Sequence, residues 1–383
     1  MSHSGLPAAR GRTVVAMSGG VDSSVAALLL TRAGVDVVGV SMQVWDYRQH
    51  GGCSTRATCC APDDFTDARK VAARIQVPYY VVDFETTFRR EVIDRFVRSY
   101  EQGITPNPCV DCNNRVKFRS LRERAASFGC STVATGHYAR ITVDDAGWHL
   151  RRGVDPAKDQ SYFLYGLTQA ELSTTLFPVG DLTKAEVREI ARAAGLVTAE
   201  KAESQDICFV AGEVRDFVRR IGRTEPRTGP IVTRAGEVVG NHDGVAGFTV
   251  GQRRGLAVGG SAEPLYVLEL VPESNTVVVG PRGELERSGF TLAECSWVAP
   301  AVRALMTVGQ EGAEFPAIAQ LRHRHPGVPV RVCLTGPDRA AVTFTGAWTT
   351  VTPGQAAVLY DLANDEVLGG GRIEPSGTSG ALV

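Results

Sequence analysis

A short run of glycine and hydroxyl residues near the N-terminus has the composition of a phosphate-binding loop. Residues 18–24 read S-G-G-V-D-S-S and lie between an apolar run, which predicts a strand, and a segment with helical spacing. Glycines let the backbone approach an anion closely, and the N–H groups at a helix N-terminus favour negative charge. The string is neither G-x-x-x-x-G-K-[ST] nor G-x-G-x-x-G, and it lacks a lysine that could reach the β and γ phosphates. The alternative interpretation is an ordinary helix start capped by Ser18.

Two further strings carry cysteines that could act as nucleophiles or metal ligands. Residues 105–113 read T-P-N-P-C-V-D-C-N, and residues 203–209 read E-S-Q-D-I-C-F. The two prolines predict a stiff, extended, non-helical loop. The basic segment 115–124 that follows would favour the thiolate, which is the nucleophilic form. Alternatively, Cys109, Cys112 and Cys208 could hold Zn²⁺ or an iron–sulfur cluster, since three thiols leave one open position.

The composition excludes several classes of protein. The 383 residues are 43% hydrophobic and 22% charged, which excludes a disordered chain, a collagen-like chain and a disulfide miniprotein. The net charge of −1 does not by itself point to nucleic acid. No apolar run approaches the ~18 residues of a membrane span, and the first twelve residues do not resemble a signal peptide. We therefore predict a cytoplasmic protein whose nine cysteines are thiols, ligands or catalytic groups.

The elements that must position these strings alternate in the first half of the chain. Strands are predicted at 13–17, 37–45, 79–84 and 130–135, and helices at 21–33, 63–75, 88–100 and 115–128. This order predicts a parallel, doubly wound sheet, which binds ligands at the carboxyl ends of its strands. Thr183 and Glu186 form a capping box that opens a helix ended by Gly195.

After about residue 210 the helical periodicity fades and short strands with turn signals take over. Hairpins are predicted at 231–240 and 265–280, and further strands at 290–298, 317–322, 328–334, 341–344 and 355–360. Strands at this spacing predict a small β barrel or sandwich.

The strings resemble those of a known family. S-G-G-x-D-S resembles the PP-loop of ATP pyrophosphatases, which cleave ATP between the α and β phosphates. Taken in order along nearly the whole chain, the strings resemble the tRNA-specific 2-thiouridylase family. The matches also include Asp63-Asp64, G-H-Y at 136–138, K-D-Q-S-Y-F-L at 158–164, T-V-G-Q-R-R-G-L at 249–256 and V-T-P-G-Q at 351–355.

The resemblance implies an α/β fold in three domains. Residues 1–210 would form a doubly wound PP-loop domain of the adenine nucleotide hydrolase type. Residues 211–278 would form a small β-rich central domain that contacts tRNA, and residues 279–383 a C-terminal β barrel.

The resemblance also implies a reaction. The enzyme, a tRNA-uridine 2-sulfurtransferase, would adenylate the 2-oxygen of the wobble uridine with ATP and Mg²⁺, and Asp22 would help to hold Mg²⁺ and pyrophosphate. Cys208 would carry the incoming sulfur as a persulfide, and Cys112 would be the nucleophile that releases it. A Cys112–Cys208 disulfide is then the natural end product. Carried over by the resemblance, the ATP-binding residues are Ala16, Met17, Ser18, Gly19, Gly20, Val21, Asp22, Ser23, Met42 and Gly136.

The implied partners are tRNA, with those for Lys, Glu and Gln expected, and a sulfur donor such as a cysteine desulfurase or a sulfur-relay protein. No membrane partner is expected. Carried over in the same way, the tRNA-binding residues are Asn107, Pro108, Cys109, His137, Lys158, Asp159, Gln160, Arg322, His323 and Gln355.

One departure from the family pattern concerns Cys109, because the family often has an aspartate there, and that residue's role does not transfer. Three alternatives remain at this point. They are thiolation through a cluster on Cys109, Cys112 and Cys208, another PP-loop adenylating ligase, and a tRNA-binding protein without chemistry. A ligase needs no thiol pair, and the intact loop at 18–24 argues against the last alternative.

Overall fold

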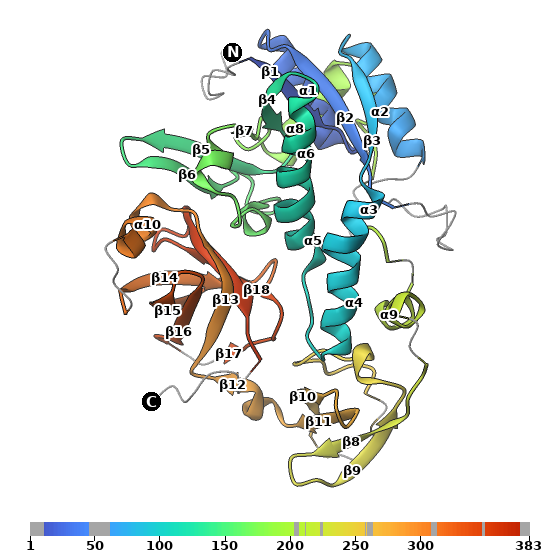
Figure 1. The fold of residues 1–383 in the computed structure, drawn as a ribbon, viewed down its shortest axis with the longest axis vertical. Coiled ribbons are helices and arrows are strands. Elements are labelled where there is room, and N and C mark those ends of the chain that lie inside the picture. Colours follow the sequence, from blue (N-terminus) through green and yellow to red (C-terminus); the bar gives the residue numbers. More distant parts are fainter. Residues whose placement is uncertain are drawn as a thin grey trace.

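The computed structural model is elongated, with three regions that follow the order of the chain (Figure 1). It describes residues 11–45, 62–202, 207–210, 212–222, 225–256, 258, 263–307, 312–346 and 349–375. An α/β domain lies at one end, a small β domain at the other, and a β barrel beside the long helices that connect them.

The N-terminal domain is the predicted parallel sheet. Its five strands are ordered β3-β2-β1-β4-β7 and every pair is parallel. The strands are β1 (Arg12–Ala16), β2 (Val37–Gln43), β3 (Tyr79–Asp83), β4 (Cys130–Ala134) and β7 (Thr175–Leu176). Successive side chains of a strand point to opposite faces. Val15 accordingly packs against α1 (Val21–Arg32), α2 (Pro62–Arg74) and α8 (Lys184–Ala193), whereas Val14 packs into a second core on the other face. The prediction of a doubly wound sheet is confirmed.

Two long helical runs stand side by side on the second core. The first joins α3 (Glu85–Phe88), a π-helical segment (Arg89–Ile93) and α4 (Asp94–Glu101). The second joins α5 (Pro108–Asp111), a π-helical segment (Cys112–Ser120) and α6 (Leu121–Ala126).

The prediction of a wholly extended loop at 105–113 is wrong, because helix begins at Pro108. Proline is tolerated at the first helical position, where its missing N–H has no partner to lose. Cys109 and Cys112 therefore lie on the first turns of a helical run.

The capping box is confirmed. The Thr183 N–H donates to Glu186 Oε2 at 2.7 Å, the Glu186 N–H donates to Thr183 Oγ1 at 3.3 Å, and Gly195 follows the helix with φ +64°. A hairpin of β5 (Ala139–Asp144) and β6 (Gly147–Arg152), followed by α7 (Gln169–Leu172), was not predicted.

The central domain contains both predicted hairpins. Its four-stranded sheet has the order β10-β11-β8-β9. The strands are β8 (Gly229–Thr233), β9 (Val238–His242), β10 (Tyr266–Val271) and β11 (Thr276–Gly280). The helix α9 (Val214–Gly222) precedes them, where we expected helical periodicity to have faded, and it buries Phe217 and Val218.

The C-terminal strands close into a six-stranded barrel rather than a sandwich, with the order β13-β16-β15-β14-β18-β19. The strands are β13 (Gly289–Trp297), β14 (Glu314–Gln320), β15 (Val328–Gly336), β16 (Arg339–Phe344), β18 (Ala356–Tyr360) and β19 (Val367–Ile373). A two-stranded pair, β12 (Glu286–Arg287) with β17 (Thr349–Thr350), and a helix, α10 (Pro300–Thr307), accompany the barrel. The closing strand β19 was not predicted.

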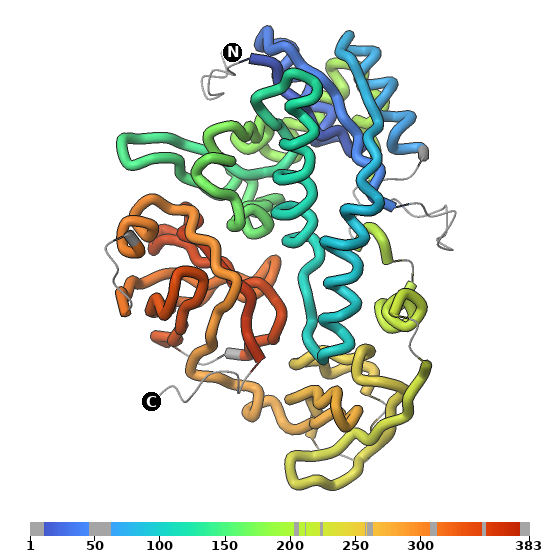
Figure 2. Tube along the Cα trace, in the orientation of Figure 1, coloured from blue at the N-terminus to red at the C-terminus, as the bar shows by residue number. Residues whose placement is uncertain are grey.

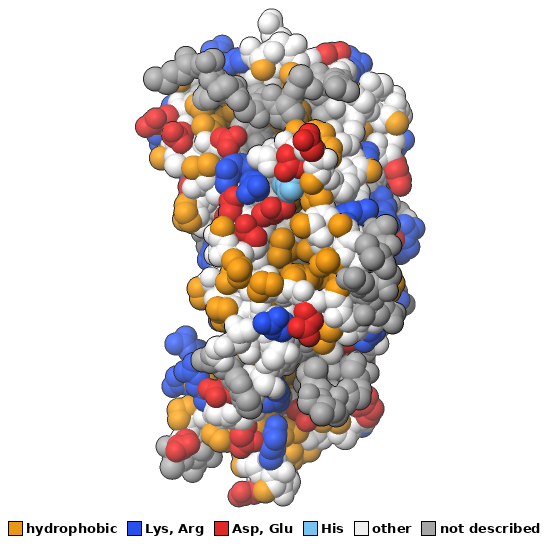
Figure 3. Space-filling model, turned by 90° about the vertical axis from the view of Figure 1, so that its left-hand side faces the viewer, with side chains coloured by type: hydrophobic (Ala, Val, Ile, Leu, Met, Phe, Trp, Pro, Cys, Tyr) orange, Lys and Arg blue, Asp and Glu red, His pale blue; other side chains and the backbone are white. Residues whose placement is uncertain are grey.

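Charged side chains of both signs are intermingled over the face shown in Figure 3, and hydrophobic side chains gather near its middle. Among the described residues, no helix is long and apolar enough to cross a membrane.

Candidate nucleotide and thiol sites

The loop at 18–24 presents the bare start of a helix. The N-cap of α1 is Gly20, and no side chain caps it, so the alternative of a helix start capped by Ser18 is wrong. Ser23 Oγ and Ser24 Oγ both donate to the Gly20 carbonyl, at 3.1 and 2.8 Å. Uncapped N–H groups at the start of a 12-residue helix favour an anion there.

Two glycines allow neighbouring backbone to close around this loop. A Cβ on Gly19, whose φ is +73°, would lie 2.3 Å from the Asp64 carbonyl oxygen. A Cβ on Gly136 would lie 2.5 Å from the Ser23 nitrogen. The end of β4 and the start of α2 therefore contact the loop directly. Gly136, predicted to lie near adenosine, is at this contact.

A lysine from a distant part of the chain lies beside the loop at 18–24. Lys184 Nζ lies 2.7 and 2.9 Å from the two carboxylate oxygens of Asp22, and the Tyr138 hydroxyl donates to Asp22 Oδ1 at 2.7 Å. Sequence reasoning missed Lys184. The position of Lys184 at the start of a helix is a signal that could have indicated it. A cation there opposes the helix dipole unless an anion compensates it.

The Asp22 carboxylate also fits a magnesium ion. Mg²⁺ is usually held by one or two carboxylates together with substrate phosphates. The Asp22 side chain is 30% exposed and stands beside the uncapped start of α1. Asp22 would help to hold the ion, and both of its carboxylate oxygens also contact Lys184 Nζ.

Both predicted reactive thiols border the second core. Cys112 and Cys208 are half-buried against it, as are Ala16 and Met42 from the predicted ATP site, whereas Cys109 is exposed. The ring of Phe209, next to Cys208, packs at 5.2–5.6 Å among the rings of three phenylalanines, Phe88, Phe96 and Phe217. This aromatic anchor fixes the end of the Cys208 segment, whose residues 203–206 lie outside the described residues.

The three thiols do not fit a metal cluster in this structure. Cys109, Cys112 and Cys208 are all described, and within the described part of the chain no three His, Cys, Asp or Glu side chains form a group that could hold a metal.

The segment before Cys109, which belongs to the N-terminal domain, is held by contacts with the other two domains. The Thr105 N–H donates to the Pro353 carbonyl at 3.1 Å, and Gln355 Nε2 donates to the Thr105 carbonyl at 3.0 Å. Thr105 Oγ1 donates to Thr249 Oγ1 at 3.1 Å. Gln355, predicted to contact tRNA, therefore uses its side chain to hold this segment.

Several other predicted tRNA contacts have internal partners. The His137 ring packs at 6.0 Å from the rings of Phe118 and Phe177, and burial holds its pKa well below 6.5. The Asp159 carboxylate accepts from Arg152 Nη1 at 2.6 Å and is 6% exposed.

Of the remaining predicted tRNA contacts, Gln160 Oε1 accepts the Tyr138 N–H at 3.0 Å, and the His323 ring packs 4.6 Å from that of Phe163. Pro108 is buried, Asn107 and Lys158 are half-buried, and Arg322 is exposed. Their contacts with tRNA stay predictions.

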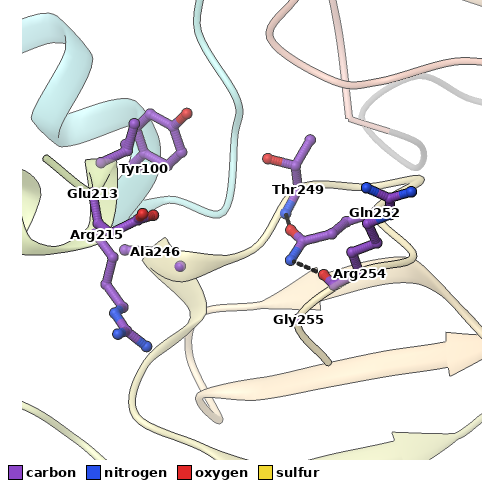
Figure 4. A pocket seen from close by; sticks show the side chains of 10 residues that line it. Tyr100, Glu213, Arg215, Ala246, Thr249, Gln252, Arg254 and Gly255 are labelled. Atoms are coloured by element: carbon purple, nitrogen blue, oxygen red, sulfur yellow. Dashed lines mark hydrogen bonds between the residues drawn. The ribbon is translucent and has the colours of Figure 1, made fainter. Parts of the chain in front are cut away.

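A pocket of about 460 Å³ lies between the end of α4, the start of α9 and the loop at 246–255 (Figure 4). Tyr100, Arg215 and Arg254 line it together with Gln252, which is fixed by the Thr249 N–H at 3.0 Å and the Arg254 carbonyl at 2.9 Å. Aromatic and guanidinium groups can contact bases and phosphates.

This parallel α/β domain, with an uncapped glycine loop and a carboxylate at the start of its first helix, defines a nucleotide-binding protein of the PP-loop class. Three family models match successive parts of the chain: a tRNA methyl transferase HUP domain (residues 11–212), a tRNA methyl transferase PRC-barrel domain (215–281) and an aminomethyltransferase beta-barrel domain (287–373).

Among the similar curated proteins, each called tRNA-specific 2-thiouridylase MnmA, one from Geobacter metallireducens is 49% identical over 97% of this chain and 99% of its own length. Another, from Geotalea uraniireducens, is 48% identical over 95% of both chains. A third, from Rhodospirillum centenum, is 47% identical over 97% of this chain and 93% of its own. The chain belongs to the tRNA-specific 2-thiouridylase family.

Proposed function

We propose that the protein is a tRNA-uridine 2-sulfurtransferase that forms 2-thiouridine at the wobble position, with release of AMP and pyrophosphate. The observation that carries this proposal is that residues of the predicted ATP site and the two predicted reactive cysteines lie against the same hydrophobic core. Ala16 and Met42 from the nucleotide side, and Cys112 and Cys208 from the sulfur side, border one hydrophobic core. The names of the family's curated members support the choice of tRNA as substrate.

In the first step, the 2-oxygen of the uridine attacks the α-phosphorus of ATP. The bond from that phosphorus to the bridging oxygen breaks, and pyrophosphate leaves with the electron pair. In this proposal the developing negative charge is stabilised by the N–H groups at the start of α1 and by the Lys184 ammonium, which also contacts Asp22. Mg²⁺ held by Asp22 would neutralise further phosphate charge.

In the second step, the terminal sulfur of a Cys208 persulfide attacks C2 of the uridine, and AMP leaves with the oxygen. The Cys112 thiolate then attacks the Cys208 sulfur and breaks the S–S bond. The electron pair stays on the sulfur attached to C2, which gives 2-thiouridine and a Cys112–Cys208 disulfide. A thiol reductant restores the two thiols.

The proposed partners follow from this chemistry. The substrates are the tRNAs for Lys, Glu and Gln, and the persulfide sulfur comes from a cysteine desulfurase or a sulfur-relay protein. The central domain and the pocket lined by Tyr100, Arg215 and Arg254 would contact the anticodon region, in the cytoplasm.

The test uses the purified full chain with tRNA, ATP, Mg²⁺ and a cysteine desulfurase with cysteine. 2-Thiouridine is measured by nucleoside mass spectrometry, and AMP and pyrophosphate are measured in parallel. We expect Cys208→Ser to abolish thiolation, Asp22→Ala to abolish pyrophosphate release, and Cys333→Ser, on β15 of the barrel, to resemble the wild type.

Full thiolation by the Cys208→Ser variant would contradict the persulfide role. Pyrophosphate release without any 2-thiouridine in the wild type would instead favour another adenylating ligase. Thiolation only by an iron-loaded sample would favour a cluster.

A further inference from the structure

A ring of five charged side chains joins the turn that bears Cys112 to the barrel. Asp111, the residue before Cys112, accepts a hydrogen bond from Arg372 Nη2 on β19 at 2.5 Å. Arg95 and Arg115 lie 3.8 and 3.7 Å from the same carboxylate oxygen. All three arginines also contact Glu294 on β13, at 3.0 to 3.4 Å. Each of the three guanidinium groups therefore lies between the two carboxylates.

The ring is shielded at its Asp111 side, where the carboxylate is 6% exposed and the Arg372 side chain is 18% exposed. An ion pair in such surroundings is screened far less than one on the surface. The charge of Arg115 is already compensated by Asp111 and Glu294, so this arginine acts mainly as a member of the ring.

The barrel backbone is irregular at Glu294, the residue that it contributes to the ring on β13. The register of β13 against β19 shifts between Ala293 and Ser296, and Glu294, inside the shift, has φ +49°. A left-handed conformation costs free energy for any residue with a side chain and persists only where the surroundings enforce it. The irregularity places the Glu294 carboxylate against Arg95 and Arg115 of the neighbouring helices.

The barrel also holds the other end of the same segment. Pro353 and Gln355 bond the backbone of Thr105, and a Cβ on Gly354 would lie 2.9 Å from the Thr105 carbonyl oxygen. In Figure 2 this segment leaves the lower end of the first long helix and rises beside the orange-red part of the barrel to the second helix. The barrel therefore contacts the 105–112 segment at both ends, through a loop at one and Arg372 at the other.

We propose that Arg372, acting through Asp111, is a positioning residue that sets the place of Cys112 for sulfur transfer. The inference rests on the proposed function and assigns the barrel a part in its second step. Adenylation uses groups on α1 and α8, outside the ring. A loss of the Arg372–Asp111 contact therefore impairs sulfur transfer and spares pyrophosphate release. Small misplacements of a reacting group can cost on the order of a hundredfold in rate.

The test is a single-turnover reaction of persulfidated enzyme with tRNA and ATP, in which pyrophosphate and 2-thiouridine are followed together. We expect Arg372→Gln to keep pyrophosphate release within about twofold of the wild type and to slow 2-thiouridine formation by tenfold or more, on the order of what misplacement costs. The adduct in which the Cys208 persulfide is bonded to C2 of the uridine should accumulate, because Cys112 is the group that releases the tRNA from it. Arg372→Lys, which keeps the charge but loses the planar fork, should recover part of the loss.

The matched control is Arg339→Gln, because Arg339 forms an ion pair with Glu374 at 2.6 Å in the same barrel. A second readout is the alkylation rate of Cys112 by iodoacetamide, followed by peptide mass spectrometry. It should change in Arg372→Gln and Asp111→Asn and not in the control. This readout needs no turnover, so it separates a failure of the inference from a failure of the proposed function.

Two results would overturn the inference. One is an Arg372→Gln variant that matches Arg339→Gln in both the 2-thiouridine rate and Cys112 alkylation. The other is an equal loss of pyrophosphate release and 2-thiouridine, which would mean general damage to the segment. If the wild type forms no 2-thiouridine, the proposed function fails, and the alkylation comparison alone decides the positioning role.

Discussion

At the scale of single residues, the Asp22–Lys184 pair links the phosphate loop to a helix that begins 162 residues later. The Lys184 ammonium stands at the start of α8, where the helix dipole disfavours a cation. The carboxylate of Asp22 offsets that cost, and the side chain of Lys184 is only 12% exposed. A half-buried cation beside an anion-binding helix start is suited to receive a phosphate group.

We predict that Lys184→Ala slows pyrophosphate release by about a hundredfold, the usual loss when one charge-stabilising donor is removed. Lys184→Arg should retain more activity because it keeps the charge. The control is Lys70→Ala, at an exposed position of α2. The rate of tRNA-dependent pyrophosphate release measures the effect, and equal rates for Lys184→Ala and Lys70→Ala would contradict this role.

The chemistry-bearing strings could be found from sequence, but their partners could not. The string at 18–24 is local, and local rules predict a strand, a turn and a helix around it. Lys184 joins it only because β4, β7 and α8 bring distant segments to one sheet edge. Likewise, nothing in the local sequence of Asp111 indicates Arg372, which lies on a strand that was not predicted.

At the scale of elements, each error has a physical cause of its own. The two prolines predict a non-helical loop, but proline is tolerated at the first helical position and Pro108 opens a helix. The strand β19 contains three consecutive glycines, which weaken any strand signal. The fold needs them, since a Cβ on Gly370 would lie 2.6 Å from the Ala357 carbonyl oxygen.

A prediction at this scale concerns the contact between the end of β4 and the start of α1, which Gly136 allows. In Gly136→Ala the new Cβ would lie 2.5 Å from the Ser23 nitrogen and 2.6 Å from the Asp22 carbonyl carbon. Both atoms are backbone, so α1 must move away from β4. We expect the affinity for ATP, measured by calorimetry, to fall at least tenfold, because a shift of an ångström can cost about that much or more.

A matched control is Gly283→Ala, which has no atom within 4 Å of its new Cβ and no positive φ. It should bind ATP as the wild type does. Undiminished ATP binding by Gly136→Ala would show that the nucleotide does not depend on this contact.

At the scale of the whole molecule, two of the attachments between the barrel and the N-terminal domain are the 105–112 segment and the β5–β6 hairpin. Arg140 and Arg151 on the hairpin each contact Asp365 of the barrel, at 2.8 and 2.9 Å, and Arg151 forms an isolated bridge with Glu366. The second attachment includes a histidine and therefore depends on pH.

His149 on β6 lies 2.7 Å from Glu366 Oε1 and 3.0 Å from Asp144 Oδ1. Burial alone would lower its pKa, but the bonds to Glu366 and Asp144 raise the pKa above 6.5. A histidine whose pKa is raised on folding stabilises the fold fully below its unfolded pKa, and that stabilisation is lost as pH rises through the folded value. The attachment of the hairpin should therefore weaken from about pH 6.5 upward.

We predict that His149→Gln removes a fall in thermal stability that the wild type shows between about pH 6 and about pH 8, the range in which a histidine with a raised pKa titrates. The control is His325→Gln, because burial lowers the pKa of His325 and gives its contribution the opposite sign, with stability lost as pH falls. In His325→Gln, thermal stability should still fall as pH rises, and more steeply than in the wild type. Calorimetry gives the unfolding midpoints, and an unchanged pH slope in His149→Gln would contradict a part for His149 in this pH dependence.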